Sequence, residues 1–68
     1  MSERVFLHFD VEFILRETDK AFLLHFDDGR EFWVPKSQIS DADDYSEGDE
    51  DCTVSITEWF CEKEGIES

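Results

Sequence analysis

The chain has 68 residues, with nineteen acidic side chains against six Lys and Arg, and its formal net charge is −13. A surface this negative repels phosphate backbones and anionic lipid, and it attracts basic partners. The composition therefore predicts a protein that binds neither nucleic acid nor membranes directly.

One small domain spanning residues 1–68 is expected, near the lower size limit for a core without metals or disulfides. Seven Phe and two Trp suit a dense core, because each aromatic side chain buries roughly 150–250 Å². No stretch approaches the ~20 apolar residues of a membrane span, and the start, MSERVFLHF, lacks the basic region and cleavage site of a signal peptide. We expect a cytoplasmic protein with Cys52 and Cys61 as free thiols.

The first predicted strand runs from Val5 to Leu15, where every odd-numbered residue is apolar. A period of two over this length is typical of a half-buried strand, and a strand longer than the usual five or six residues is expected to bend. Phe6 and Ile14 are the apolar exceptions at even-numbered positions. The odd-numbered side chains are therefore predicted to form the core face.

The second predicted strand, Ala21 to Phe26, follows a polar turn and has apolar side chains at each even-numbered position. Placing the apolar residues of both strands on one face selects a single antiparallel register. Its opposed pairs are Val11 with Phe26, Phe13 with Leu24, Leu15 with Phe22, and Glu17 with Lys20.

The turn before the third predicted strand contains Asp27-Asp28-Gly29. A two-residue Asp28-Gly29 turn would direct the next apolar residues away from the core face. We predict instead a three-residue loop with Gly29 in the left-handed conformation. This loop sets Leu24 opposite Phe32 and Phe22 opposite Val34.

Pro35 either ends the third predicted strand or lies on an edge of the sheet, because proline cannot donate to a β-ladder. Alternation resumes from Asp51 to Thr57 and predicts a fourth strand. Trp59 to Glu64 predicts a short helix, N-capped either by Ser55 in a capping box or by Thr57.

Gly65 is predicted to adopt the left-handed conformation after this helix, with Ile66 against Cys61 as in a Schellman closure. With four strands and one short helix, the sheet is expected to curl around its Phe-rich face. The predicted fold class is mainly β (α+β). It is a four-stranded antiparallel curled sheet or small barrel with one short C-terminal helix, in the order β-β-β-β-α.

Two segments, EFWVPKSQI at Glu31 to Ile39 and ITEWFCEKEGI at Ile56 to Ile66, resemble a largely uncharacterised family of small proteins carried by bacteriophages and plasmids. Members of that family show a Trp-hydrophobic-Pro-Lys-Ser-Gln-Ile stretch, an acidic variable loop, and a closing helix that begins with a Glu-Trp pair. Thr57 stands where the family often has Pro. The resemblance implies a viral or mobile-element origin and a cytoplasmic site of action, and no catalytic residue carries over.

The predicted register places Glu12 and Glu31 on either side of His25, with about 5 Å between opposed Cβ atoms. Two carboxylates and an imidazole could hold a divalent metal or act as an acid/base group, which makes a metal-dependent enzyme one hypothesis. A solvated row of side chains without chemistry is the other.

Three large apolar residues, Ile14, Leu23 and Trp33, are predicted to share the outer face of the sheet. Apolar side chains on a wet face require a cover. Either the C-terminal helix lies over them with Trp59, or they form an exposed anchor patch for a protein partner or a homodimer.

The acidic loop, residues 40–51, carries seven of the nineteen acidic residues. Its spacing fails the calcium-binding EF-hand frame, since Ser46 stands where Gly is needed and Cys52 where a bidentate acid is needed. The loop is either flexible and solvated or a surface that recognises a basic protein. The residues expected to bind such a partner are Asp41, Asp43, Asp44, Glu47, Asp49, Glu50 and Asp51 for charge, with Trp33 and Trp59 as anchors.

These features predict a noncatalytic interaction protein of phage or plasmid origin that needs no cofactor and that binds and modulates a basic protein. Nucleic-acid-handling enzymes, among them antiviral defence complexes, fit this chemistry. Carboxylates two residues apart along a strand, such as Asp10 and Glu12, are spaced ~6.6 Å and can imitate successive phosphates. The alternatives are a homo-oligomeric structural subunit joined through its Trp row, and the metal-dependent enzyme.

Overall fold

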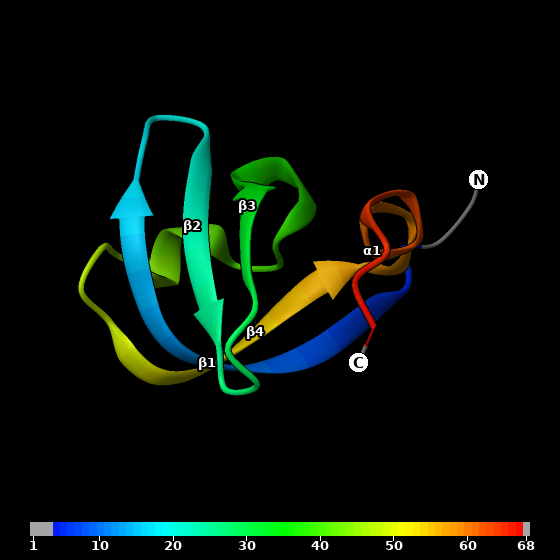
Figure 1. Ribbon diagram of the computed structural model, residues 1–68. Helices are drawn as coiled ribbons and strands as arrows, with labels where there is room; N and C mark the ends of the chain where they lie inside the picture. Colours follow the sequence, from blue (N-terminus) through cyan, green and yellow to red (C-terminus); the bar gives the residue numbers. More distant parts are fainter. Residues whose placement is uncertain (1–3, 68) are drawn as a thin grey trace.

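Four antiparallel strands form one curled sheet in the computed structural model, which describes residues 4–67 (Figure 1). The order of the strands across the sheet is β3-β2-β1-β4. The predicted class, mainly β with the chain order β-β-β-β-α, is confirmed. The elements are β1 (Phe6–Glu17), β2 (Ala21–Phe26), β3 (Glu31–Pro35), the 3₁₀ turns η1 (Lys36–Gln38) and η2 (Ala42–Asp44), β4 (Glu50–Thr57) and the helix α1 (Glu58–Glu64).

The sheet curls without closing into a barrel. Strands β3 and β4 lie at its two edges and do not pair with each other. Among residues 4–67, the segment that follows β3 and η1 contacts β4 through an isolated β-bridge between Ile39 and Ile56. Of the two predicted architectures, the curled sheet is therefore the one that forms.

Strand β1 is a central strand of the sheet and pairs with both β4 and β2. It pairs with β4 from Phe6 to Phe13 and with β2 from Val11 to Glu17, so the two ladders overlap over only a few residues. Figure 1 shows β1 curving strongly along its length, from blue to cyan. The predicted bend is the means by which one twelve-residue strand serves both halves of the sheet.

The predicted register between β1 and β2 is correct only at its first pair, Val11 with Phe26. The register shifts between Val11 and Phe13 and again between Ile14 and Arg16, which marks two bulges in β1. The pairs predicted for Phe13, Leu15 and Glu17 are therefore wrong. The observed pairs are Phe13 with His25, Ile14 with Leu24, Arg16 with Leu23, and Glu17 with Phe22.

The bulges also reverse which side chains of β1 enter the core. Phe9 and Val11 are buried as alternation predicts, but Ile14 is 1% exposed and Leu15 is 39% exposed. A bulge adds one residue to a strand, so each residue beyond it changes face. Phe13, predicted to be a core residue, is only half-buried.

The hairpin from β2 to β3 forms as predicted. Gly29 has a φ of +91° and its N–H donates to the Phe26 carbonyl at 2.9 Å, which gives the three-residue loop with the glycine at the positive-φ position. The opposed pairs include Phe22 with Val34 and Leu24 with Phe32. Strand β3 ends at Pro35, as expected for a proline on an edge strand.

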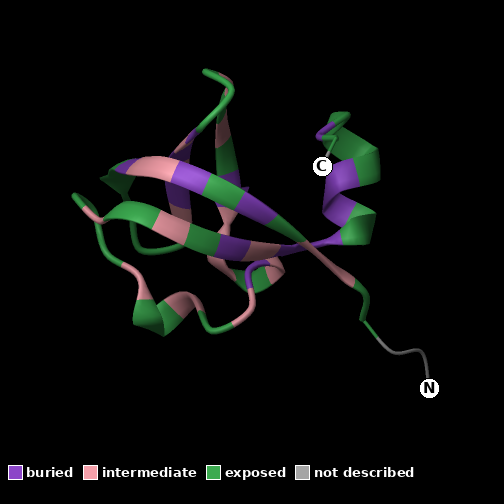
Figure 2. Ribbon diagram, turned by 90° about the horizontal axis from the view of Figure 1, so that it is seen from below, coloured by how far each residue is buried: buried purple, intermediate pink, exposed green. Residues whose placement is uncertain are grey.

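The core lies inside the curl of the sheet, and α1 closes one end of it. Figure 2 shows buried and exposed residues alternating along the strands, with buried residues on the side of α1 that faces the sheet. The rings of Phe9 and Phe26 stack at 5.3 Å between centroids. The buried apolar residues are Phe9, Val11, Ile14, Phe22, Leu24, Phe26, Val34, Ile39, Val54, Ile56, Phe60, Cys61 and Ile66.

The two ends of α1 have defined caps. The Thr57 hydroxyl accepts a hydrogen bond from the Phe60 N–H at 3.3 Å, so Thr57 is the N-cap and the alternative prediction, Ser55, is wrong. Gly65 has a φ of +72°, and the Ile66 N–H donates to the Cys61 carbonyl at 2.8 Å. This confirms the predicted left-handed closure, with Ile66 buried. None of the described helices is long and apolar enough to cross a membrane.

Candidate protein-binding surfaces

The first half of the acidic loop lies along the outer edge of β4. The Ser40 N–H donates to the Ser55 carbonyl at 2.9 Å, and the Tyr45 hydroxyl donates to the Thr53 carbonyl at 2.7 Å. Tyr45 is half-buried and packs against the core together with Ala42. The loop thus covers backbone acceptors of an edge strand that would otherwise be open to pairing with another chain.

The second half of the acidic loop is tied to the end of β1. The Glu17 N–H donates to the Glu47 carboxylate at 2.9 Å, and the Glu47 N–H donates back to the Glu17 carboxylate at 3.1 Å. Lys36 completes this group, since its Nζ lies 2.7 Å from Glu17 Oε2. The hydrogen bond from Lys36, followed by the one from the Glu47 backbone, lowers the pKa of Glu17 below its ordinary value.

Two backbone hydrogen bonds fix the loop further. The Gly48 N–H donates to the Ile14 carbonyl at 2.8 Å, and the Ile14 N–H donates to the Asp49 carbonyl at 2.9 Å. The acidic loop is therefore held in one conformation by contacts at both of its ends. A fixed loop presents its charges at defined positions, which lowers the ordering entropy lost on binding.

The seven acidic residues predicted to bind a partner divide into two groups. Two of them serve the loop itself, because the Glu47 carboxylate accepts from Glu17 and the Asp49 carboxylate accepts from the Ser46 N–H at 2.9 Å. The other five side chains are exposed and take part in none of the ion pairs within 4.0 Å among residues 4–67. These five are Asp41, Asp43, Asp44, Glu50 and Asp51.

His25 does lie between Glu12 and Glu31, as predicted. Its Nδ1 is 2.9 Å from Glu31 Oε2, whereas its Nε2 is 4.0 Å from Glu12 Oε1, because the first bulge places Phe13 rather than Glu12 directly opposite His25. Among residues 4–67, no group of three or more His, Cys, Asp or Glu side chains has the geometry to hold a metal ion. The row is a group of polar side chains at the surface, with one hydrogen bond between His25 and Glu31, and all three side chains are partly open to solvent.

The apolar row on the outer face differs from the predicted one in two ways: it lacks one of the three residues, and α1 does not cover it. Ile14 is a core residue, while Leu23 and Trp33 remain opposite each other on the outer face, with Trp33 50% exposed. The predicted cover by α1 and Trp59 is wrong, because α1 packs against β4 and β1. Of the predicted row, Leu23 is half-buried and only Trp33 is exposed, and its role as an anchor stays a prediction.

Leu15 is an exposed apolar residue that alternation misplaced in the core. It is 39% exposed and directly follows the buried Ile14. The signal was present in the sequence, since three consecutive apolar residues from Phe13 to Leu15 cannot all obey a period of two. Such an interruption inside a long strand indicates a bulge.

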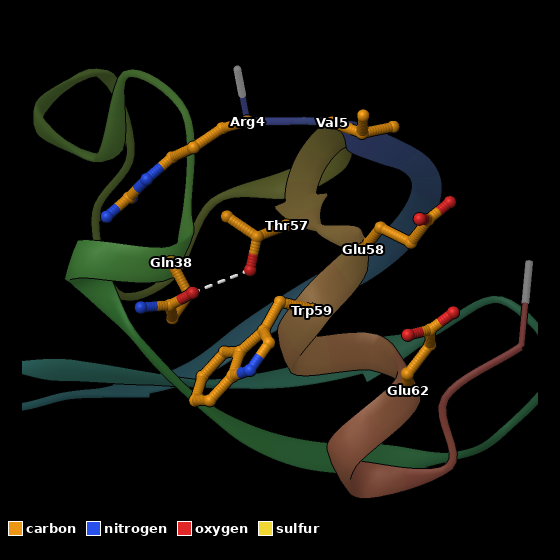
Figure 3. Close-up of a pocket in the computed structure, with 7 residues that line it drawn as sticks. All are labelled: Arg4, Val5, Gln38, Thr57, Glu58, Trp59 and Glu62. Atoms are coloured by element: carbon orange, nitrogen blue, oxygen red, sulfur yellow. Dashed lines mark hydrogen bonds between the residues drawn. The ribbon is translucent and has the colours of Figure 1, made fainter. Parts of the chain in front are cut away.

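A surface pocket of about 400 Å³ lies beside the start of α1, and sequence reasoning did not find it. Figure 3 shows Trp59 forming one side of it, with Gln38 and Thr57 above the indole in this view. The Thr57 hydroxyl donates to Gln38 Oε1 at 2.6 Å, which joins the segment after β3 to the helix cap. The other residues that line the pocket are Arg4, Val5, Glu58 and Glu62.

The pocket has an apolar side and two charged ends. Trp59 is 61% exposed and Val5 is 55% exposed. In Figure 3 Glu58 and Glu62 lie on one side of the pocket, and the Arg4 side chain extends toward the other. There, Arg4 Nη1 donates to the Ser37 carbonyl at 2.9 Å. The predicted anchors Trp33 and Trp59 are thus both exposed, but Trp33 does not line this pocket.

The two cysteines offer no activated nucleophile. Cys61 is buried and Cys52 is half-buried, and both are free thiols. Burial, reinforced by neighbouring carboxylates, raises the pKa of each thiol above its ordinary value of 9.0. A raised pKa keeps a cysteine protonated and unreactive at neutral pH.

No protein-family model, no curated protein and no solved structure matches this chain. The fold, the anchored acidic loop, the exposed Trp33 and the Trp59 pocket are therefore the observations on which a functional argument can be built.

Proposed function

We propose that this chain is a noncatalytic acidic interaction protein, of phage or plasmid origin and cytoplasmic, that binds and modulates a basic protein. The observation that carries the proposal is the anchoring of the acidic loop. Its contacts with Ser55, Thr53, Ile14 and Glu17 hold five exposed carboxylates in place, and none of the five forms an ion pair with a residue from 4 to 67. Repulsion among such charges is a cost to folding that a cationic partner would relieve.

The partner class follows from charge. With a net charge of −13, the protein attracts cationic surfaces and repels phosphate groups, so a protein that normally holds nucleic acid fits best. Nucleic-acid-handling enzymes, including antiviral defence complexes, have such surfaces. The origin in a phage or plasmid rests on the two sequence segments around Trp33 and Trp59 alone.

The charge is expected to act mainly on the rate of association. Opposite charges steer encounter and raise the association rate constant, and the effect weakens with salt. Apolar residues such as Trp33 would then slow dissociation, because aromatic side chains supply much of the energy at interfaces. Binding should therefore fall steeply as ionic strength rises.

The test is capture of bacterial lysate proteins on the immobilised protein at about 50 mM and about 500 mM salt, followed by titration of the purified partner. The loop variant carries Asp41→Asn, Asp43→Asn and Asp44→Asn. Its matched control neutralises three exposed acids elsewhere, with Asp19→Asn, Asp27→Asn and Glu64→Gln, and has the same net charge.

We expect the wild type and the control to retain one basic protein at low salt, and the loop variant to lose it. Equal loss in the loop variant and in the control would show that only net charge matters, and would contradict a role for the loop. Failure of the wild type to retain any basic protein at low salt would overturn the proposed function.

An alternative function, a homo-oligomeric subunit, draws support from one observation. Trp33 is 50% exposed on the outer face of β3, an edge strand. Against it stands the repulsion between two copies that each carry a charge of −13. Sedimentation of a concentration-independent monomer at high salt, where this repulsion is screened, would eliminate the alternative.

A further inference from the structure

The fold keeps Trp59 at the surface rather than in the core. The next two residues of α1, Phe60 and Cys61, are the ones that face the sheet and are buried. Thr57 caps the helix and fixes the backbone of its first turn, so the indole projects from a defined position. A Trp that is 61% exposed and beside a pocket is a typical anchor for a binding partner.

Two carboxylates line the same pocket as this indole and lie on the side away from Gln38 (Figure 3). Glu58 and Glu62 are exposed, four residues apart on α1, and neither takes part in an ion pair within 4.0 Å among the described residues. Like charges at this spacing repel each other and destabilise a helix. A cation bound between them would remove that repulsion.

The nearest cations do not fill this role. Arg4 is directed to the opposite side of the pocket, where it donates to the Ser37 carbonyl (Figure 3). Lys63 lies over the indole, with its Nζ 5.1 Å from the ring centroid of Trp59, so this cation contacts the ring and forms no ion pair within 4.0 Å with Glu58 or Glu62. The end of the pocket at Glu58 and Glu62 remains negative.

We infer that the Trp59 pocket binds the side chain of an arginine presented by the basic partner. The inference rests on the proposed function for the class of partner. The planar guanidinium stacks on the indole of Trp59 and donates to the carboxylates of Glu58 and Glu62, while its aliphatic stem packs against Val5. Arginine suits this site better than lysine because a flat, weakly hydrated cation both stacks on aromatic rings and forms paired hydrogen bonds to carboxylates.

The test uses a capped peptide, acetyl-Gly-Arg-Gly-Arg-Gly-amide, titrated into ¹⁵N-labelled full-length protein at about 50 mM salt. Two further peptides replace both arginines by lysine or by citrulline, the neutral isostere of arginine. The chain has two Trp residues, so the indole N–H signals report separately on Trp33 and Trp59. The expected result is a saturable shift of the Trp59 signal with the arginine peptide, weaker binding of the lysine peptide, and no shift with citrulline.

Variants locate the site. Trp59→Leu is expected to weaken binding of the arginine peptide roughly tenfold, the loss that corresponds to one cation–π contact of moderate strength. Glu58→Gln with Glu62→Gln retains the indole and should weaken binding by a similar factor. The matched control, Asp19→Asn with Asp27→Asn, has the same net charge as this double variant and should bind within about twofold of wild type, since distant exposed charges are screened.

Several outcomes would overturn the inference. These are a shift of the Trp33 signal without one of Trp59, equal binding of the arginine and citrulline peptides, binding of the lysine peptide as tight as that of arginine, or equal weakening by the carboxylate double variant and its charge-matched control. Urea unfolding of each variant establishes that it is folded before binding is compared.

The outcome is separable from that of the proposed function. If Trp59→Leu captures the basic partner as the wild type does and the arginine peptide leaves Trp59 unmoved, the pocket assignment fails and the proposed function stands. If the wild type retains no basic protein but the peptide binds at Trp59, the proposed function fails and the pocket remains a site for arginine.

Discussion

Strand β1 pairs regularly with β4 and irregularly with β2. Toward β4 the register is constant, from Phe6 opposite Thr57 to Phe13 opposite Glu50. Toward β2 it shifts twice between Val11 and Arg16. Alternation of apolar and polar residues therefore predicts the burial of Phe9 and Val11 correctly in the half of β1 that pairs regularly, and it fails in the half that contains the bulges. It is also wrong for Val5, just before β1, which is 55% exposed. The bulges bend the strand, and the bend allows the sheet to curl around a core in a chain of only 68 residues.

The largest expected effect is a difference in stability between substitutions of two neighbouring residues in the part of β1 that pairs irregularly with β2. Ile14→Ala should lower the free energy of unfolding by about 2–5 kcal/mol, because Ile14 is 1% exposed and its removal leaves a cavity. Leu15→Ala should lower it by less than about 1 kcal/mol, because Leu15 is largely outside the core. Urea unfolding of both variants measures the difference. Unbroken alternation would give the opposite order.

On the regular side, β4 ends at Thr57, whose hydroxyl makes two hydrogen bonds. Thr57→Val preserves the shape of the side chain but loses the cap of α1 and the bond to Gln38, and should lower the free energy of unfolding by about 1–2 kcal/mol. Thr57→Ser keeps both hydrogen bonds and should cost less. A smaller effect for Val than for Ser in thermal unfolding would show that the methyl group, not the hydroxyl, matters here.

The acidic loop is attached to the regular side through Tyr45, and its loss should be milder. Tyr45→Phe removes the hydrogen bond to Thr53 and should lower the free energy of unfolding by about 1 kcal/mol near pH 7. If the variant instead matched wild type and the loop amides kept their protection from hydrogen exchange, the hydroxyl would have no anchoring role.

Tyr45 also predicts a dependence on alkaline pH. Burial, followed by nearby Cys52 and acidic groups, raises its pKa above the ordinary value of 10.0. The folded protein then holds the phenolic proton more tightly than the unfolded chain does, so this contribution is complete below about pH 10 and is lost as pH rises through the raised pKa. Tyr45→Phe should make the fall in stability above pH 10 shallower. The free energy of unfolding is measured from pH 8 to 11. If it falls with pH as steeply in the variant as in the wild type, this prediction is contradicted.

The smallest effect concerns the contact of the loop with the irregular side, through Glu17. Because its pKa is lowered from 4.5, first by the hydrogen bond from Lys36, the stability it contributes is complete above about pH 4.5 and is lost as pH falls through the lowered pKa. Lys36→Met removes that cause and should flatten the acid side of the stability profile. Lys20→Met removes an exposed charge of the same sign and serves as the control. Its free energy of unfolding is expected to fall with decreasing pH as steeply as that of the wild type.

The sequence was most informative where local chemistry and burial agree. Gly29 selected the three-residue loop, Gly65 ended the helix, and Pro35 ended an edge strand, because each of these residues has backbone preferences that few neighbours can override. These signals, with the alternating apolar residues, were sufficient for the number, type and order of the elements. The pair of β2 and β3 followed in correct register.

Of the candidate surfaces, the sequence located the acidic loop and both exposed tryptophans, but not how the loop is held. The neighbours of Glu47 and Tyr45 are residues 30 and 8 positions away in the chain, and no local pattern encodes such contacts. The Trp59 pocket likewise joins three separate segments, at Val5, Gln38 and Glu62. These three segments come together only because the sheet curls.

The chain's composition and periodicity were enough to specify a β-rich fold with a strongly negative exterior, since charge is a sum over residues and strand periodicity is a property of adjacent ones. Which side of β1 each residue faces past Val11, and which carboxylates stay unpaired, depended on long-range packing. The register toward β2 shifts twice where β1 curves from its ladder with β4 into its ladder with β2, and a bulge turns the residues beyond it to the other face. The bulges placed Ile14 inside and Leu15 outside.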